Sequence, residues 1–299
     1  MREYQAQAEA QVGGWKDVGF VPTMGALHAG HVSLVAEARR RHGTVAASIF
    51  VNPTQFGAGE DLDKYPRRLD ADIKMLAAAG VACVFAPDSR EMYGEEPPLC
   101  HVEPRAFGDT CEGLARPDFF RGVATVVTKL FNIVRPTTAY FGQKDVAQCV
   151  LVQRLVQDLN MPVRIHVCET MRDADGLAMS SRNAYLNDGE RRVAGILHKA
   201  LCAAKLLCEQ QGQNHLNPAG LSRLDVIAAA ERTLRQEPLV GNIEYVSVAS
   251  PRHMRELDAV SREEGAVISA AVRLGSVRLI DNVLVGNASA KILDGGILR

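Results

Sequence analysis

The first regular pattern in the chain is a short apolar stretch that leads through a turn into an amphipathic helix. Residues 18–21 are apolar and β-branched, as in a buried strand, and Pro22, which cannot donate a hydrogen bond to a sheet, predicts the end of that strand. From about Gly30, apolar residues recur at helical spacing. We therefore expect residues 23–29 to form a strand-to-helix turn.

The alternation of strand and helix patterns continues to about residue 167. Apolar β-rich runs predict strands at 44–51, 81–85, 138–141 and 163–167. Helical patterns lie between them at 67–79, 123–134 and 146–159. We also expect a short strand at 99–102 and no helix in the turn-rich stretch 111–122. This order predicts parallel pairing, with ligands beyond the carboxyl ends of the strands.

From residue 188 the helices and strands are grouped separately. Helices are expected at 191–209, with Val193, Ile196, Leu197, Leu201 and Leu206 inward, and at 224–236, joined by a polar connection at 210–218. Strands are expected at 242–248, 266–272 and 276–285. We thus predict an α/β fold: a Rossmann-like parallel-sheet domain (1–185) followed by a smaller α+β C-terminal domain (186–299). We expect a short helix or disorder at residues 1–17, and we expect residues 288–299 to form a loosely ordered tail.

Composition restricts the classes of function. The 34 Lys and Arg against 35 Asp and Glu give a net charge of −1, so no general attraction to nucleic acid or anionic membranes is expected. The N-terminus lacks the apolar core of a signal peptide, and no run is long enough to span a bilayer, which predicts a cytoplasmic protein. The seven scattered cysteines suggest neither a zinc site nor a disulfide framework, and we expect most to be buried.

The turn after the first strand carries the strongest chemical signal. Gly25 and Gly30 allow close backbone approach, and His28 and His31 are three residues apart, so both imidazoles can face one ligand. The unpaired N–H groups at the start of a helix and its positive dipole favour a phosphate. The alternative is that one histidine caps the helix and the other lies on the surface.

Other strand exits add polar groups. Gln55 suits a polar organic substrate, whereas Asn52 is better explained as stabilising a tight turn. Lys144 and Gln148 would share one helical face, and Ser180, Ser181 and Arg182 would wrap phosphates from a flexible loop. We interpret Tyr65 and Asp72 as solvated surface residues. Arg116 and Arg121 are candidate anion partners by charge, although a solvated surface arginine is the more common case.

These segments resemble a known family. The string P-T-M-G-A-L-H-A-G-H (22–31) is similar to the signature of the pantothenate synthetase family of adenylate-forming nucleotidyltransferases. N-P-T-Q-F (52–56), F-G-Q-K-D-V-A-Q (141–148), M-S-S-R (179–182) and R-L-I-D-N (278–282) extend the match. The resemblance implies ATP-binding residues at Met24, Gly25, Ala26, Leu27, His28, Ala29, Gly30, His31, Gly142, Gln143, Lys144, Asp145, Met171, Met179, Ser180, Ser181 and Arg182. It also implies pantoate contacts at Gln55 and Gln148.

The implied reaction activates pantoate with ATP to an acyl adenylate, which the amine of β-alanine then attacks. His31, His28 and Lys144 would be catalytic, with His31 the proton donor in the family and all three stabilising charge on the α-phosphate. Mg²⁺ would accompany the triphosphate, without a dedicated protein metal site, and the family implies a homodimer. Two alternatives remain. A different nucleotidyltransferase should carry extra arginines in place of Gln55 and Gln148, and a nucleotide sensor should tolerate loss of a histidine or of the Ser-Ser-Arg loop.

Overall fold

The structure is a computed structural model that describes residues 17–211 and 221–293. These residues form two compact units, and each unit is built from several segments of the chain. The first unit comprises Met1–Gly108, Arg116–Gly142 and Leu151–Cys168, and the second comprises Asp109–Ala115, Gln143–Val150 and Glu169–Arg299. The expectations for residues 1–16 and for nearly all of the connection at 210–218 lie outside the described residues.

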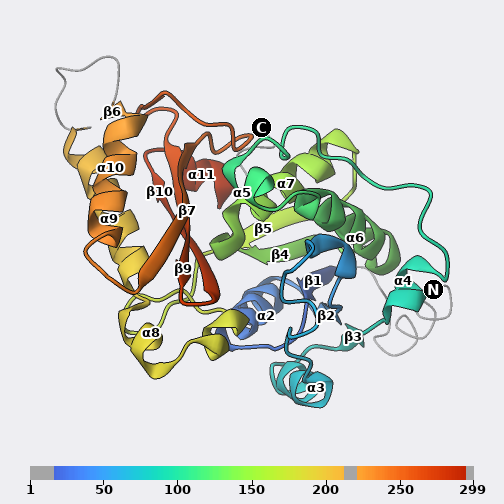
Figure 1. Ribbon diagram of the computed structural model, residues 1–299. Helices are drawn as coiled ribbons and strands as arrows, with labels where there is room; N and C mark the ends of the chain where they lie inside the picture. The colour runs from blue at the N-terminus through green and yellow to red at the C-terminus, as the bar shows by residue number, and fades with distance from the viewer. Residues whose placement is uncertain (1–16, 212–220, 294–299) are drawn as a thin grey trace. The chain divides into compact units, whose positions relative to one another are not determined.

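A five-stranded parallel sheet organises the first unit (Figure 1). Its order is β3-β2-β1-β4-β5, and every neighbouring pair is parallel. The strands are β1 (Val18–Thr23), β2 (Thr44–Ile49), β3 (Cys83–Phe85), β4 (Thr138–Gly142) and β5 (Arg164–Cys168). The predicted parallel α/β architecture is therefore confirmed.

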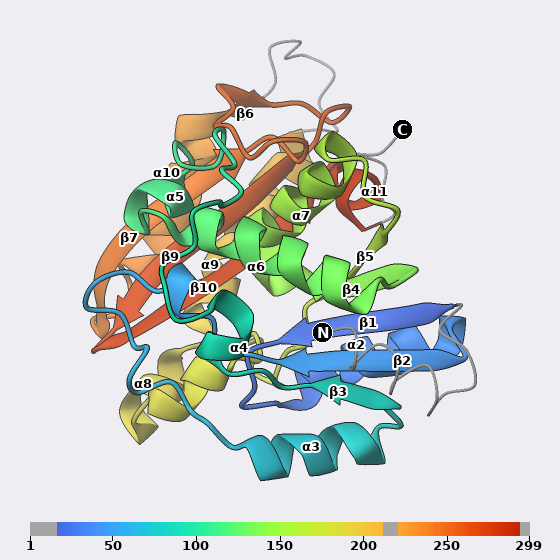
Figure 2. The same ribbon diagram turned by 90° about the vertical axis from the view of Figure 1, so that its right-hand side faces the viewer.

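Helices cover both faces of this sheet. Figure 2 shows α6 (Phe119–Val134) on one face and α3 (Leu69–Ala78) on the other. On the face of α3, α2 (Ala29–Arg41) buries Leu34, Val35 and Ala38 in one apolar cluster with strand residues. Two further helices in the chain are α4 (Ser89–Tyr93) and α7 (Val146–Asp158).

The strand order reverses direction between β1 and β4. In open parallel sheets, ligands gather beyond the carboxyl ends of the strands at such a reversal. The histidine turn follows β1, and the turn Gln143–Asp145 (η2) follows β4 in the chain. The Asn52–Gln55 turn follows β2, which is the other neighbour of β1.

The second unit contains a three-stranded antiparallel sheet with two helices. The sheet order is β10-β9-β7, formed by β10 (Val277–Val285), β9 (Ala266–Leu274) and β7 (Val240–Ala249). The helices α9 (Ile196–Gln211) and α10 (Arg223–Leu234) bury Leu197, Leu201 and Leu234 in a common core with this sheet. A two-residue pair, β6 (Leu221–Ser222) and β8 (Ala259–Val260), lies beside it. The predicted α+β character of the C-terminal region is confirmed.

A buried ionic cluster explains why residues 109–115 belong to the second unit. Glu112, in α5 (Cys111–Ala115), accepts two hydrogen bonds from Arg278 and one from Tyr245 at 2.7–3.1 Å. Arg278 also pairs with Glu244 at 2.7 Å. Burial and the neighbouring Glu112 carboxylate raise the pKa of the Tyr245 phenol well above its ordinary value, so this group stays a donor.

Several expectations about elements are wrong. The region 111–122 is helical at α5 and at the start of α6, and 99–102 forms no strand. β1 continues through Pro22 to Thr23, because Pro22 still pairs with Ser48 of β2. The tail forms α11 (Ala288–Ile292) before the described chain ends.

The expected helix at 191–209 is two helices. α8 (Asp188–Val193) and α9 are separated at Gly195, where a Cβ would lie 2.5 Å from the carbonyl oxygen of Asp175. Only glycine leaves room for this close approach, and helical periodicity alone does not reveal it. Leu206 was expected inward but is 53% exposed.

The cysteines also differ from expectation, since only Cys149 of the seven is buried.

Candidate active site

A buried carboxylate holds the turn after β1. Asp72, in the first turn of α3, is 3% exposed, and its oxygens accept the backbone N–H of Ala26 at 2.8 Å and of Leu27 at 2.9 Å. Gly25 and Ala26 have left-handed φ angles of 83° and 50°, which direct successive N–H groups toward one acceptor. A Cβ on Gly25 would lie 3.0 Å from Asp72 Oδ2, so this position needs glycine.

The expectation that Asp72 and Tyr65 are surface residues is therefore wrong. Tyr65 is 6% exposed and packs edge-on against Phe56, with ring centroids 5.8 Å apart. The contacts of Asp72 join residues 45 and 46 positions apart, which a local sequence pattern does not reveal.

His28 and His31 cap α2 reciprocally. His28 Nδ1 accepts the N–H of Gly30 at 3.1 Å, and His31 Nδ1 accepts the N–H of His28 at 3.3 Å. The two ring centroids are 4.2 Å apart. A neutral imidazole whose Nδ1 accepts a hydrogen bond carries its proton on Nε2, so each ring has an N–H donor at Nε2.

The start of α2 differs from expectation in one respect. The N–H groups of Ala26, Leu27, His28 and Gly30 have intramolecular acceptors and are not unpaired. Of the alternative that one histidine caps the helix and the other lies on the surface, the capping part is confirmed, whereas neither histidine is an exposed surface residue. Any attraction of this turn for an anion therefore rests on the helix dipole and the imidazole N–H groups rather than on those four backbone donors.

The turn after β2 is fixed by Asn52, which is 1% exposed. Its Nδ2 donates to Gln55 Oε1 at 3.1 Å and to the Gly122 carbonyl at 3.2 Å, and its Oδ1 accepts from the Tyr93 hydroxyl at 2.7 Å. The turn-stabilising interpretation of Asn52 is confirmed. Gln55 Nε2 lies 3.0 Å from Met24 Sδ, which brings the second turn against the first.

Arg116 is not a solvated surface residue. Its guanidinium donates to both carboxylate oxygens of Glu60, at 2.6 and 2.8 Å, and to the Gln55 carbonyl at 3.1 Å. It also lies 3.8 Å from the ring centroid of Phe119. Arg116 therefore supports the backbone of the Gln55 turn, whereas Arg121 pairs with Asp118 at its own helix start.

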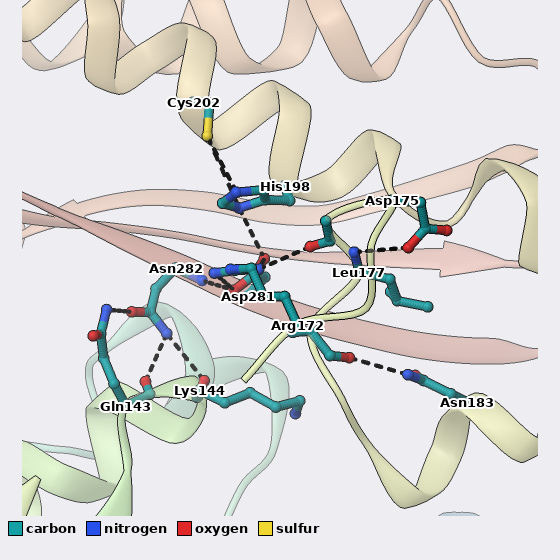
Figure 3. Close-up of polar contacts among 12 residues, drawn as sticks. Gln143, Lys144, Arg172, Asp175, Leu177, Asn183, His198, Cys202, Asp281 and Asn282 are labelled. Carbon is teal, nitrogen blue, oxygen red and sulfur yellow. Dashed lines mark hydrogen bonds and ion pairs between the residues drawn. The ribbon is translucent and has the colours of Figure 1, made fainter. Parts of the chain in front are cut away.

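In the second unit, Lys144 lies in the turn η2, and β10 holds the backbone of this turn. Asn282, 1% exposed, donates its Nδ2 to the carbonyl of Gln143 at 2.8 Å and to that of Lys144 at 3.0 Å (Figure 3). Its Oδ1 accepts from Gln143 Nε2 at 3.0 Å. Lys144 Nζ is 3.9 Å from Asp145 Oδ1, and Gln148 follows, half-buried, in α7.

The segment before Ser180 is an ordered hairpin rather than an aperiodic loop. A β-bridge joins Arg172 to Ala178, and the N–H of Met179 donates to the carbonyl of Met171 at 2.9 Å. Arg172 forms a two-pronged ion pair with Asp281 of β10 at 2.6 and 2.9 Å and also donates to the Gly176 carbonyl (Figure 3).

The Ser-Ser-Arg string follows this hairpin directly. Ser180 Oγ accepts the N–H of Arg182 at 3.3 Å and caps a short 3₁₀ helix, Ser181–Tyr185 (η3). The hydroxyl of Ser180 still has its proton to donate. The hydroxyl groups of Ser180 and Ser181 and the guanidinium of Arg182 therefore lie at a capped turn.

Asp281 is a buried anion. Burial disfavours its charged form, but hydrogen bonds from His198 and Arg172 outweigh this effect and hold the pKa of the carboxyl below its ordinary value. His198 Nδ1 lies 3.5 Å from Asp281 Oδ2, and its Nε2 lies 3.4 Å from Cys202 Sγ. Burial raises the pKa of the Cys202 thiol, so this group stays protonated at neutral pH.

Each unit thus brings some of the predicted residues together. The first unit brings Met24 and Gln55 together and pairs His28 with His31; the second joins the Lys144 turn and the 171–182 segment to adjacent residues of β10. Sequence reasoning missed Asp72, Arg172, Asp281 and Asn282 as supporting groups. The R-L-I-D-N string did draw attention to the last two, but only as a family match.

Two further observations concern the described residues only. They contain no group of three or more His, Cys, Asp or Glu side chains placed to hold a metal ion. Among them, too, no helix has the length and apolar character needed to cross a membrane.

Comparisons with known proteins agree with these motifs. A pantothenate synthetase of Herpetosiphon aurantiacus is 48% identical over 274 residues, covering 91% of this chain and 94% of the relative. One from Chloroflexus aurantiacus is 50% identical over 269 residues, covering 90% and 92%. The crystal structure of pantothenate synthetase from Thermus thermophilus matches with a TM-score of 0.84 at 41% identity, covering 94% of this chain and 97% of that one.

A second solved structure adds ligands. The pantoate–β-alanine ligase of Francisella tularensis, complexed with βγ-ATP and β-alanine, matches with a TM-score of 0.72 at 32% identity over 95% of each chain. The family model for pantoate–β-alanine ligase matches residues 1–284. The chain therefore belongs to the pantoate–β-alanine ligase family.

Proposed function

We propose that this enzyme condenses pantoate with β-alanine at the expense of ATP, giving pantothenate, AMP and pyrophosphate through a pantoyl-adenylate intermediate. An amide does not form spontaneously from a carboxylate and an amine in water, so the acid must first be activated. Attack of the pantoate carboxylate on the α-phosphorus releases pyrophosphate. The amine of β-alanine then attacks the acyl carbon and releases AMP.

The observation that carries the chemical assignment is the reciprocal cap formed by His28 and His31. It fixes both rings with their protons on Nε2 at the start of a helix, where the dipole favours negative charge. Fixed N–H donors stabilise charge that develops on phosphate oxygens in the transition state. We assign this role to both histidines, with His31 as the proton donor.

The remaining phosphate contacts are assigned to the second unit. Lys144 supplies a point charge, and Arg182 supplies a planar cation beside the hydroxyls of Ser180 and Ser181. Gln143, Asp145, Met171 and Met179 of the second unit would complete the nucleotide contacts, with Asp145 accepting from ribose hydroxyls. In the first unit, Gly142 and the 24–31 turn are assigned to the nucleotide as well. In this proposal residues 1–185 bind ATP and pantoate, and 186–299 form the smaller C-terminal domain.

Gln55 and Gln148 are assigned to pantoate. An amide both donates to and accepts from hydroxyl and carboxylate groups without adding charge. Gln55 is 8% exposed and is oriented by Asn52 and Met24, which supports a binding role more than a surface one. The same glutamine would then lie near β-alanine in the second step.

Three features remain proposals by family resemblance. We propose that Mg²⁺ enters with ATP, largely hydrated, as part of the nucleotide substrate. We also propose that the enzyme is a homodimer and acts in the cytoplasm.

The decisive experiment is ATP–pyrophosphate exchange with and without pantoate. Exchange that requires pantoate and not β-alanine, followed by pantothenate formation when β-alanine is added, supports the proposal. Exchange without pantoate, or with a phosphorylated substrate in its place, would favour another nucleotidyltransferase. Pantoate-independent ATP binding with no exchange would favour a nucleotide sensor.

A further inference from the structure

We propose that Asp281 and Asn282, neighbours on β10, are positioning residues that hold the two phosphate-binding segments of the second unit in register with each other. One segment is the Lys144 turn, and the other is the hairpin that leads into Ser180–Arg182. The inference rests on the proposed function, which assigns phosphate binding to these two segments. It adds a role for two buried residues that contact neither phosphate nor substrate in this assignment.

Asn282 controls the first segment through the backbone. Its side chain makes three hydrogen bonds to the turn, two to consecutive carbonyls and one from Gln143 Nε2, across 138 and 139 residues of sequence. Both amide hydrogens and the amide oxygen are used. The Lys144 carbonyl therefore has a fixed position, and the side chain of Lys144 extends from it (Figure 3).

Asp281 controls the second segment through Arg172. The parallel hydrogen bonds between guanidinium and carboxylate fix both the distance and the plane of the Arg172 side chain. The same guanidinium donates to the Gly176 carbonyl, and Asn183 Nδ2 donates to the Ala178 carbonyl at 3.0 Å. The hairpin is thus attached to β10 just before the chain enters the 3₁₀ helix of Ser181 and Arg182.

The geometry of a strand explains why one dipeptide can serve both segments. Adjacent side chains on a strand point to opposite faces. Asp281 therefore faces Arg172 and His198 on α9, and Asn282 faces η2. The two side chains are also linked, because the N–H of Asn282 donates to Asp281 Oδ1 at 2.8 Å. A shift of β10 would move both segments together.

A double-mutant cycle tests the first arm of the proposal. Misplacing a binding group by about 1 Å can cost roughly 100-fold in rate, so Asn282→Ala should lower kcat/KM for ATP in the exchange assay by about that factor. If Asn282 acts through Lys144, adding N282A to the Lys144→Ala enzyme should lower kcat/KM for ATP by less than about a further twofold. Equal losses in both backgrounds would overturn the proposal.

A second cycle tests the other arm. Asp281→Asn keeps the size of the side chain but removes the charge that orients Arg172. It should raise KM for ATP more than KM for pantoate, and its effect should nearly vanish in an Arg182→Ala background. An undiminished effect in that background would mean that Asp281 does not act through the Ser-Ser-Arg segment.

A matched control and a second readout keep the test decisive. Ser269→Ala changes a buried residue paired with Asn282 across the sheet and should leave exchange within about twofold of the unmodified enzyme. If N282A does not fold, Asn282→Ser, which retains a hydroxyl donor, takes its place.

A binding measurement provides a second readout. The affinity of each variant for ATP, measured by calorimetry without pantoate, allows the same double-mutant cycles to be calculated without the reaction taking place. Loss of pantoate-dependent exchange in the unmodified enzyme would refute the proposed function alone, whereas additive affinities would refute the positioning role.

Discussion

The carboxylate of Asp72 accepts the backbone N–H of Leu27 at 2.9 Å, although 45 residues separate them in the chain. With the matching bond to Ala26, this contact maintains the left-handed turn that precedes the histidine pair. The position of the imidazoles therefore depends on a helix that carries none of the predicted site residues.

This relationship makes Asp72→Ala the first prediction. Leaving the buried N–H of Leu27 and the partly buried N–H of Ala26 without acceptors should cost about 2–4 kcal/mol of unfolding free energy and should lower exchange activity by more than tenfold. Urea unfolding and the exchange assay measure the two effects. Asp70→Ala, an exposed carboxylate in the same helical turn, is the control and should change neither by much. Near-normal exchange in D72A would mean that the turn holds its shape without this acceptor.

The second prediction separates capping from catalysis at His31. His31→Ala should reduce adenylate formation by several orders of magnitude and also remove the acceptor for the His28 N–H. His31→Asn retains an acceptor of capping type, so it should recover stability but not activity. Thermal unfolding together with pyrophosphate release distinguishes the two. Pyrophosphate release close to normal in H31A would refute the assigned role.

The third prediction concerns the pantoate contact. Gln148→Ala should raise KM for pantoate by about tenfold or more and change KM for ATP less, because it removes a substrate hydrogen bond rather than a phosphate contact. Initial rates at varied pantoate and varied ATP provide the comparison. A larger effect on ATP would show that Gln148 faces the nucleotide.

The fourth prediction follows from the lowered pKa of Asp281. A carboxyl whose pKa is lower in the folded state stabilises the fold above its unfolded pKa, near its ordinary value of 3.8. This contribution is lost as the pH falls through the folded value. Asp281→Asn should therefore reduce the free energy of unfolding at neutral pH, and the difference from the unmodified protein should shrink as the pH falls below the ordinary pKa of the carboxyl. A difference that grows as the pH falls would contradict the assigned ion pair.

The fifth prediction addresses the divalent ion. If Mg²⁺ enters only with ATP, chelation should abolish exchange, and added Mg²⁺ should restore it without changing the thermal unfolding midpoint of the protein in the absence of ATP. A marked stabilisation by Mg²⁺ alone would indicate a binding site on the protein itself.

The sequence was informative wherever the cause of structure is local. Periodicity located the parallel strands and the principal helices, and the histidine turn was recognised from its position after a strand. The failures have non-local causes. Gly195, between α8 and α9, lies against the Asp175 carbonyl. Gly122, in the first turn of α6, lies against the Thr54 carbonyl, where a Cβ would be 2.2 Å away.

The supporting groups of the site were missed for the same reason. Asp72 has the appearance of an ordinary acidic residue at the start of a helix, and Asn282 that of a polar residue within a strand. Only tertiary contacts reveal their partners. The roles of His31, Lys144 and Gln148 stay predictions that the experiments above can decide.

The tight connection between β9 and β10 has a consequence for engineering. Leu274 pairs with Val277, so only Gly275 and Ser276 separate the strands, and Gly275 has a φ of 56°. A side chain at position 275 would collide with the carboxylate of Glu190, so this tip admits little change. A single residue inserted between Leu279 and Asp281 would exchange the faces presented by the acid and the amide and also those of the core residues Val283 and Val285. The second unit would then lose core packing together with the position of its proposed nucleotide-binding segments.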